Sequence, residues 1–317
     1  MRYGRIRGLD APVSRIVLGT GLFPPIEVLD RFCALGGTAI DTGTSYPREA
    51  ELGRWLARRP ERDRLVVLGK GGHPRRGPDG AFGPARVTPS DLADDLESSL
   101  ERLQLRWLDV FVAHRDDPDH DLEPIMEFLD SCVRRGRVRA LGASNWSRER
   151  FARANEIAAD RGWAPLVVAS PQFSLAVARE PEFPGSRSVS GPGRRDERAW
   201  YEAHGVALWG WSPLACGFLA GGLAGDSPYG ELRRGLWRRC YDTEDNHARA
   251  RRLEDLARRR GATPAQIAIA YVLSSHANVS AVTTCSSEPR LVEDVGALDL
   301  ELTRAELDHL EGPIAVA

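Results

Sequence analysis

Leu65-Val66-Val67-Leu68-Gly69-Lys70 is the stretch that decides the fold, because an unbroken apolar run leads directly into a charge. Such a run predicts a strand buried on both faces, as in a parallel sheet, that delivers the charge to its carboxyl end. Lys70 is also the only lysine in a chain whose Lys and Arg residues together number 43. Since this sequence uses Arg wherever a generic positive charge would do, the one lysine indicates a site that needs a compact ammonium group.

Working outward from this run, short β-rich stretches alternate with amphipathic ones over nearly the whole length. The strand candidates are Ile16–Gly19, Thr38–Asp41, Leu65–Lys70, Leu108–His114, Arg139–Ser144, Leu166–Gln172, Val206–Trp211 and Val279–Thr283. The helix candidates are Pro25–Leu35, Glu49–Arg58, Pro89–Leu103, Glu123–Arg135, Arg148–Arg161, Arg194–Ala203, Ala248–Arg259, Pro264–Leu273 and Pro289–Leu298. Eight strand-then-helix units without a break in composition predict one (β/α)8 barrel, a single domain spanning residues 1–317.

The alternative fold is a doubly wound sheet. That fold usually carries a glycine-rich dinucleotide fingerprint directly after its first strand. Here Gly19-Thr20-Gly21-Leu22-Phe23-Pro24 lacks both the third glycine and the start of a helix. The barrel is therefore the favoured prediction.

Three further segments lie outside the repeating units. Arg2–Gly8 and Pro12–Leu18 flank Leu9-Asp10-Ala11, which predicts a β-hairpin that closes the bottom of the barrel. Arg179–Gly193 and Ala215–Asn246 lack periodicity and each follows a strand. Loops after strands lie on the carboxyl face of a barrel, where ligands bind, so we expect these two long loops to shape a pocket.

Composition narrows the class of protein. The net charge of −2 and the pI near 6.4 give no basic field, which argues against nucleic acid or an anionic membrane as the main partner. The cysteines at 33, 132, 216, 240 and 285 form no CxxC pair, which favours reduced thiols over disulfides and gives no support for a metal site. Without a signal-like amino terminus or a run of about 20 apolar residues, we expect a soluble cytoplasmic protein.

Four polar residues stand at or just past the predicted strand ends: Asp41, Tyr46, Lys70 and His114. On a barrel they would converge on one face. A tyrosine exchanges protons poorly near neutral pH unless a cation stabilises its phenolate. Lys70 could supply that cation, Asp41 could hold Lys70 by a charge-assisted hydrogen bond, and His114 could bind a substrate oxygen. Each residue alone could be purely structural; only the four together are specific.

The chain resembles the aldo-keto reductase superfamily in six motifs that follow the family's order. They are Asp41–Tyr46, Leu68–Lys70, Asp109–Arg115, Gly142–Asn145, Ser170–Phe173 and Trp211–Leu214, and the segment Thr283–Asp294 follows them. The resemblance implies a hydride transfer from nicotinamide C4 to a carbonyl carbon. It implies Tyr46 as general acid, Lys70 and Asp41 as the residues that tune it, and His114 as the residue that orients the carbonyl.

The resemblance also implies a cofactor site. Ser144, Asn145 and Gln172 would bind the nicotinamide carboxamide, and Trp211 would stack on the ring where the family usually has tyrosine. The complete set of cofactor residues that it implies is Gly19, Thr20, Gly21, Asp41, Ser144, Asn145, Gln172, Trp211, Ser212, Pro213, Leu214, Gly217, Ser286, Ser287, Arg290 and Asp294.

The choice between NADPH and NADH depends on the last of these motifs. Ser286, Ser287 and Arg290 occupy the positions that bind the adenosine 2′-phosphate in the family, and arginine suits a phosphate dianion. Thr284 replaces a basic residue frequent in the family, and Asp294 replaces an asparagine that contacts adenine. We expect NADPH, with NADH as the alternative.

The expected substrate is a small aldehyde or ketone, with Arg115 and Trp146 near the mouth of the pocket. Two other functions stay open. One is a cofactor-binding regulatory subunit with little turnover, and the other is reduction of a C=N or C=C bond by the same fold. His114 favours carbonyl reduction, because enone-reducing relatives have a carboxylate at this position.

Overall fold

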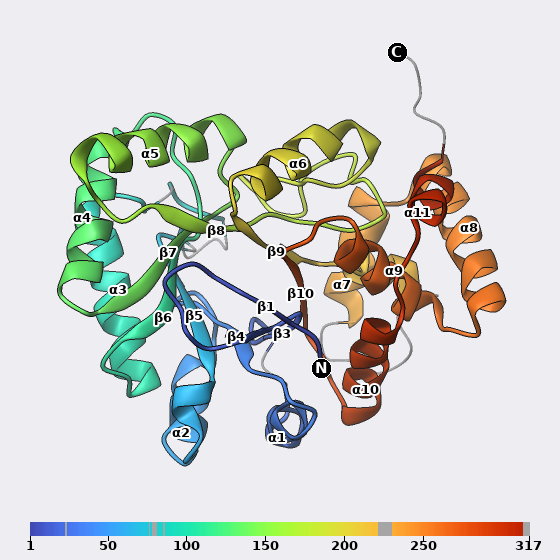
Figure 1. Cartoon of the computed structure of the whole chain (residues 1–317), viewed down its shortest axis with the longest axis horizontal. Helices are drawn as coiled ribbons and strands as arrows, with labels where there is room; N and C mark the ends of the chain where they lie inside the picture. The colour runs from blue at the N-terminus through green and yellow to red at the C-terminus, as the bar shows by residue number, and fades with distance from the viewer. Residues whose placement is uncertain (23, 76, 78–80, 85, 221–229, 313–317) are drawn as a thin grey trace.

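Eight parallel strands close into a barrel in the computed structural model, which describes residues 1–22, 24–75, 77, 81–84, 86–220 and 230–312. The strands are β3 (Ile16–Gly19), β4 (Ala39–Asp41), β5 (Val66–Gly71), β6 (Leu108–Ala113), β7 (Val138–Ser144), β8 (Leu166–Ser170), β9 (Ala207–Trp211) and β10 (Val279–Thr283). They follow one another around the barrel in chain order, and β10 pairs with both β9 and β3 (Figure 1). The (β/α)8 prediction is confirmed, and the alternative of an open doubly wound sheet is wrong.

Helices surround the strands (Figure 1). They are α1 (Ile26–Ala34), α2 (Glu49–Leu56), α3 (Pro89–Leu103), α4 (Leu122–Arg134), α5 (Arg148–Arg161), α6 (Arg195–Ala203), α7 (Gly230–Cys240), α8 (Glu244–Arg260), α9 (Pro264–Ser274), α10 (Glu288–Gly296) and α11 (Arg304–Glu311). Short 3₁₀ helices lie at Arg62–Arg64, Pro192–Arg194, Ala215–Ala220 and Ala297–Asp299. The nine predicted helices are present, α3 and α5 with their predicted bounds and the others with shifted ends, whereas α7 and α11 were not predicted.

The predicted long loop Ala215–Asn246 is therefore partly wrong. It contains a 3₁₀ helix, α7 and the beginning of α8, and its residues 221–229 lie outside the described part of the chain. Helix α7 buries only Gly230 and Cys240 among its residues, so it has no apolar stripe from which a helix could be predicted. The other long loop, Arg179–Gly193, is irregular up to the 3₁₀ turn at its end, as expected.

Side chains point alternately to the two faces of each strand, and both faces are buried, which explains why the strand sequences are continuously apolar. Val66 and Leu68 of β5 point into the barrel interior, so Lys70, two residues further, points inward as well. Gly69 faces the other way, where a methyl group of Leu108 would lie 2.5 Å from an added Cβ. Helices cover that outer face, and both faces are therefore buried.

The amino-terminal hairpin is shorter than predicted. Its strands β1 (Tyr3–Gly4) and β2 (Val13–Ser14) pair antiparallel, and Figure 1 shows them crossing one end of the barrel. Ile6 belongs to the interior apolar cluster, so the hairpin closes the end opposite the carboxyl ends of the strands.

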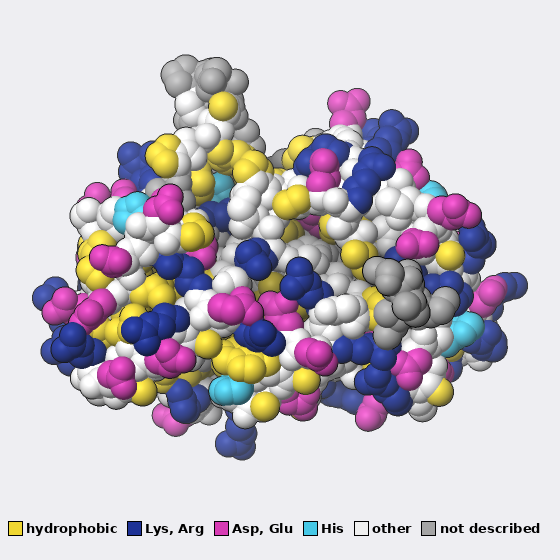
Figure 2. All heavy atoms as spheres, turned by 90° about the horizontal axis from the view of Figure 1, so that it is seen from above, with side chains coloured by type: hydrophobic (Ala, Val, Ile, Leu, Met, Phe, Trp, Pro, Cys, Tyr) yellow, Lys and Arg dark blue, Asp and Glu magenta, His cyan; other side chains and the backbone are white. Residues whose placement is uncertain are grey.

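On the face shown in Figure 2, arginine and acidic side chains lie interspersed rather than gathered into a patch of one sign. All five cysteines are unpaired thiols. Among the described residues, no helix is long and apolar enough to cross a membrane.

Candidate active site

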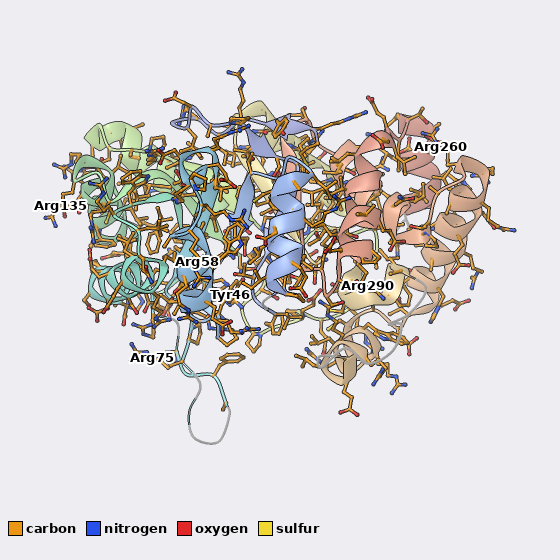
Figure 3. All side chains as sticks on the ribbon, turned by 90° about the horizontal axis from the view of Figure 1, so that it is seen from below. Tyr46, Arg58, Arg75, Arg135, Arg260 and Arg290 are labelled. Carbon is orange, nitrogen blue, oxygen red and sulfur yellow. The ribbon has the colours of Figure 1, made fainter. Side chains whose placement is uncertain are left out.

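A cavity of about 650 Å³ opens at the carboxyl ends of the strands. Asp41 of β4, Lys70 of β5, Ser144 of β7 and Trp211 of β9 all line it. Figure 3 shows Tyr46 on this edge of the barrel, with Arg290 farther along on the side of the C-terminal helices. The topology therefore brings residues that are distant in sequence to one face, as predicted.

Lys70 lies between an acid and a phenol. Its ammonium contacts Asp41 Oδ1 and donates a hydrogen bond to the Tyr46 hydroxyl at 3.1 Å, while that hydroxyl lies 3.5 Å from Asp41 Oδ1. Asp41 and Lys70 are each only 3% exposed. Burying an ion pair is costly, and apolar residues of the same size often stabilise a fold as well or better, so this pair points to a functional role.

The three groups change one another's protonation. Burial alone lowers the pKa of Lys70, but the Asp41 carboxylate and the Tyr46 phenol outweigh it and the net pKa is raised, so Lys70 stays charged. Burial raises the pKa of Tyr46. Lys70 opposes that rise, which is the sign expected from the sequence, yet burial dominates. Tyr46 is thus a neutral phenol that carries a transferable proton and touches a fixed cation.

His114 follows β6, and its backbone N–H donates to the Gly71 carbonyl at 2.8 Å. Its ring meets the Tyr46 ring edge-on with centroids 5.9 Å apart. Burial, followed by the charges of Arg115 and Lys70, lowers the pKa of His114 well below its usual value. A neutral imidazole has a single N–H, which can donate to an oxygen in the cavity next to the Tyr46 hydroxyl.

Ser144 and Asn145 form the wall beside His114. The Asn145 amide donates to the His114 carbonyl at 3.1 Å and to Ser144 Oγ at 2.9 Å, and Ser144 Oγ donates to the Ser170 carbonyl at 2.7 Å. These bonds link the ends of β6, β7 and β8. Asn145 takes a left-handed conformation with φ of 65°, which asparagine tolerates better than most residues.

Gln172 and Trp211 lie on the next two strand ends. The Gln172 amide donates to Ser174 Oγ at 3.0 Å and accepts from Ser190 Oγ at 2.9 Å. Gln172 lines a second cavity, of about 340 Å³, and not the main one. Trp211 lines the main cavity with its ring centroid 6.4 Å from that of Phe183. Trp211 thus offers an aromatic face to the cavity, whereas the Gln172 amide is already hydrogen-bonded inside the protein.

The segment Ser212-Pro213-Leu214-Ala215-Cys216-Gly217 has an unusual backbone. Ser212, Ala215, Cys216 and Gly217 take positive φ values of 56°, 49°, 56° and 95°. Backbone in such turn conformations can direct N–H groups toward an anion. Here the N–H groups of Ala215 and Gly217 donate to the Ser212 and Leu214 carbonyls, at 2.9 Å each. The resemblance implies a pyrophosphate contact for Ser212, Leu214 and Gly217 in this segment.

A second feature that would suit an anion lies at the start of α10. Ser287 occupies the N-cap position of this helix without a side-chain capping bond, and Arg290 follows in its first turns. The positive end of a helix dipole and an arginine both suit a phosphate. Arg290 has no ion-pair partner in the part of the chain that the structure describes.

Arg233 of α7 lies near Arg290. Sequence reasoning missed it, because the pair Arg233-Arg234 resembles ordinary solvated surface. Burial lowers the pKa of Arg233, and the neighbouring Arg290 charge adds to that effect. Asp294 is 5% exposed and accepts a hydrogen bond from the Cys285 thiol at 3.2 Å. Burial raises the pKa of Asp294 to about 6.

The segment Gly19-Thr20-Gly21 lies next to Asp41 and Tyr46. Both the backbone N–H and the hydroxyl of Thr20 donate to the Asp41 carbonyl, at 2.9 and 3.0 Å. A Cβ on Gly21 would lie 3.4 Å from the Tyr46 ring, so the backbone approaches the phenol closely. This segment therefore lies directly against the Tyr46 ring and the end of β4.

Comparison with known proteins agrees with this geometry. The model of the Aldo/keto reductase family matches residues 24–314. The chain belongs to this family. It is 30% identical over 305 residues to the L-glyceraldehyde 3-phosphate reductase of Escherichia coli K12, which covers 91% of this chain and 83% of that protein. It is also 30% identical over 225 residues to the versiconal hemiacetal acetate reductase of Aspergillus parasiticus, over 70% of this chain and 61% of that protein.

One residue of this aldo/keto reductase that no sequence signal indicated is Glu182. It is 3% exposed and accepts hydrogen bonds from Ser212 Oγ at 3.1 Å and from the Cys216 thiol at 3.2 Å, and Tyr241 donates to its other oxygen. Burial raises its pKa. Glu182 lies in the loop before the 3₁₀ turn at Pro192–Arg194. Its carboxylate thus links this loop to the positive-φ segment Ser212–Gly217 and to the residue that follows α7.

The two candidate substrate residues occupy different places. Arg115 lines the main cavity, whereas Trp146 belongs to the buried core beneath it. The Trp146 indole N–H donates to the Arg115 carbonyl at 3.0 Å, and Arg150 stacks on the ring. Trp146 therefore helps to fix the backbone of Arg115 from within the buried core.

Proposed function

We propose that this aldo/keto reductase uses NADPH to reduce an aldehyde or ketone to an alcohol. The observation that carries the proposal is the buried contact of one ammonium, that of Lys70, with both the Asp41 carboxylate and the Tyr46 phenol at the floor of the cavity. We further propose that the barrel works as one domain, residues 1–317, and that its reduced thiols fit the cytoplasm.

NADPH, when bound, would supply a hydride for the carbonyl carbon. The Tyr46 hydroxyl gives its proton to the carbonyl oxygen as that oxygen gains negative charge. Lys70, held by Asp41, stabilises the phenolate that remains, so the phenol can act as an acid despite its raised pKa. The neutral His114 imidazole donates a hydrogen bond to the same oxygen and orients the carbonyl.

The residues around the cavity suit the cofactor. Trp211 offers a face for the nicotinamide ring, Ser144 and Asn145 lie beside it, and the positive-φ segment after β9 suits the pyrophosphate. Arg290 at the start of α10 would bind the 2′-phosphate that only NADPH carries, with Arg233 adding positive charge nearby. Ser286 and Asp294 would complete this end of the site.

The test is a screen of cofactor oxidation with aldehydes, ketones and sugar-derived carbonyls, using NADPH and NADH in parallel. Glyceraldehyde 3-phosphate belongs in the panel because one relative is named for it. We expect turnover with NADPH that Tyr46→Phe removes. Tight cofactor binding with no turnover on any carbonyl would instead favour a regulatory subunit, and turnover confined to imines or enones would change the bond that is reduced.

A further inference from the structure

One cation in the active-site cavity has no countercharge. Arg115 and Arg198 are the two most buried arginines in the described part of the chain, at 7% and 4% exposed. Arg198 donates to the Glu311 carboxylate at 3.1 Å and to two carbonyls. Arg115 donates through Nη1 to the His114 carbonyl at 2.9 Å, and no carboxylate of the described residues lies within ion-pair distance of it. A buried cation without a partner is costly.

The acid next to Arg115 in the sequence does not pair with it. Asp116 binds the Arg150 guanidinium, which also donates to the carbonyls of Asp117 and His120 at 2.8 Å each. Asp116 is thereby committed to another arginine. Asp116 is therefore adjacent to Arg115 in the sequence but does not neutralise its charge.

Arg115 is held in place from several sides. Trp146 binds its carbonyl, and Asn145 binds the carbonyl of the preceding His114 at 3.1 Å. An added Cβ on Gly185 would lie 3.8 Å from Arg115 Cδ, so this loop residue packs beside the side chain. The guanidinium is therefore preorganised, and four of its five N–H groups have no protein acceptor among the described residues.

Arg115 also lies close to the reacting groups. It lines the same cavity as Tyr46 and His114, and its charge acts on both of them. Two rings near His114 also line this cavity: the His73 ring lies 4.7 Å from that of His114, and Phe82 packs on His73 at 5.4 Å. Charged residues that include Arg75, Asp94 and Asp95 line the cavity as well. A small molecule whose carbonyl oxygen reached Tyr46 would place a substituent against the guanidinium.

We propose that Arg115 binds an anionic group of the substrate, so that this enzyme reduces small aldehydes or ketones that carry a carboxylate or a phosphate. This inference rests on the proposed reductase function and adds the substrate class to it. The planar guanidinium can bind either anion through two parallel hydrogen bonds.

Matched substrate pairs test the proposal. Succinic semialdehyde is compared with butanal, and glycolaldehyde phosphate with glycolaldehyde, by kcat/KM with NADPH. We expect the anion of at least one pair to be preferred, and the pair with the larger preference tells carboxylate from phosphate. Arg115→Gln should reduce that preference, the ratio of the two kcat/KM values of a pair, about 10- to 150-fold, the range for a charge-assisted hydrogen bond. Any effect of the Arg115 charge on Tyr46 and His114 is common to both substrates of a pair and cancels in this ratio. Arg115→Lys should retain part of the preference.

Two controls distinguish a direct contact with the substrate anion from a general effect of positive charge and from an effect on the cofactor. Arg75→Gln removes an exposed arginine at the mouth of the same cavity and should keep the anion preference. The NADPH dissociation constant of Arg115→Gln should match that of the parent. Equal loss of preference in both glutamine variants, or a loss of NADPH affinity as large as the loss of anion preference, would overturn the proposal.

A binding measurement does not depend on turnover. Succinate and glycerol 3-phosphate, neither of which can be reduced at a carbonyl, are titrated calorimetrically into the full chain. One of them should bind at least tenfold more weakly to Arg115→Gln than to the parent. Unchanged affinity for both would overturn the proposal even in an active reductase, whereas absence of turnover on every carbonyl with anion binding intact would refute only the reductase function.

Discussion

Two regions at the carboxyl ends of the strands satisfy their charges in different ways. On the reaction side, which comprises Asp41, Tyr46, Lys70 and His114, the ammonium already contacts its acid and its phenol. On the binding side, which comprises Ser212–Gly217 and the start of α10, Arg290 has no ion pair with any described residue. A charged group such as Lys70, whose partners are protein side chains, is held in position for a reaction. A cation such as Arg290, which has no partner in the described protein, is available to bind an anionic ligand. Substitutions on the first side should therefore change kcat, and those on the second should change cofactor affinity.

The largest effect is expected from Tyr46→Phe. The change removes the transferable proton and keeps the ring that packs against His114. We expect kcat to fall by about 10²- to 10⁴-fold, the usual contribution of a general acid. Steady-state rates on the best carbonyl give the loss, and fluorescence titration with NADPH should give a dissociation constant close to the parent's. A variant that kept the parent rate would remove Tyr46 from the mechanism.

Lys70→Arg should come next, with a loss in kcat on the order of 10²-fold, because a small displacement of reacting groups costs about that much. The planar guanidinium is larger than the ammonium, and Gly43 already packs so closely that an added Cβ there would lie 3.2 Å from Lys70 Cβ. The matched control is Arg58→Lys, the reverse change at an exposed arginine, which should be neutral. Normal kcat in the Lys70→Arg protein would show that any cation suffices there.

Much of this arrangement could be predicted from the sequence, for physical reasons that particular elements make clear. Strands β3 and β10 have the predicted bounds, because both of their faces are buried and most of their residues are apolar. Helix α3 also has its predicted bounds, since Thr88 caps it by accepting from the Asp91 N–H and Pro89 begins it. The four reaction-side residues could be predicted because barrel topology alone brings strand ends together.

Glu182 shows what could not be predicted. Its three donors lie 30, 34 and 59 residues further along the chain, and nothing in an irregular Pro- and Gly-containing loop indicates which of its acids is buried. The free guanidinium of Arg115 was equally hidden, because only the fold shows that Asp116 pairs with Arg150 instead. Such features depend on tertiary contacts that no local pattern encodes.

Arg290→Ala tests whether the unpaired arginine on the binding side binds the cofactor phosphate. Only NADPH carries a 2′-phosphate, so we expect its dissociation constant to rise about 10- to 150-fold while that of NADH changes little. The control is Arg135→Ala, an exposed arginine at the end of α4. Fluorescence titration of both cofactors against each variant gives the ratio. Equal losses for the two cofactors would mean that Arg290 packs on the adenine, and a parent that binds NADH more tightly would reverse the cofactor assignment.

The smallest effect is expected from Glu182→Leu, and it tests whether the binding side depends on preorganised backbone. Leucine fills similar space but cannot accept the bonds from Ser212 and Cys216, so the positive-φ segment loses its anchor. An ordinary hydrogen bond contributes about 0.5–1.5 kcal/mol, or roughly a 2- to 13-fold change in binding. Because the pyrophosphate is common to both cofactors, NADPH and NADH should weaken by the same factor, unlike in Arg290→Ala. Glu180→Leu, two residues away on the surface where Glu180 pairs with Arg239, is the control and should bind both cofactors normally. A Glu182 variant that discriminated between the cofactors, or that lost kcat at saturating cofactor, would show that this carboxyl belongs with the reaction side instead.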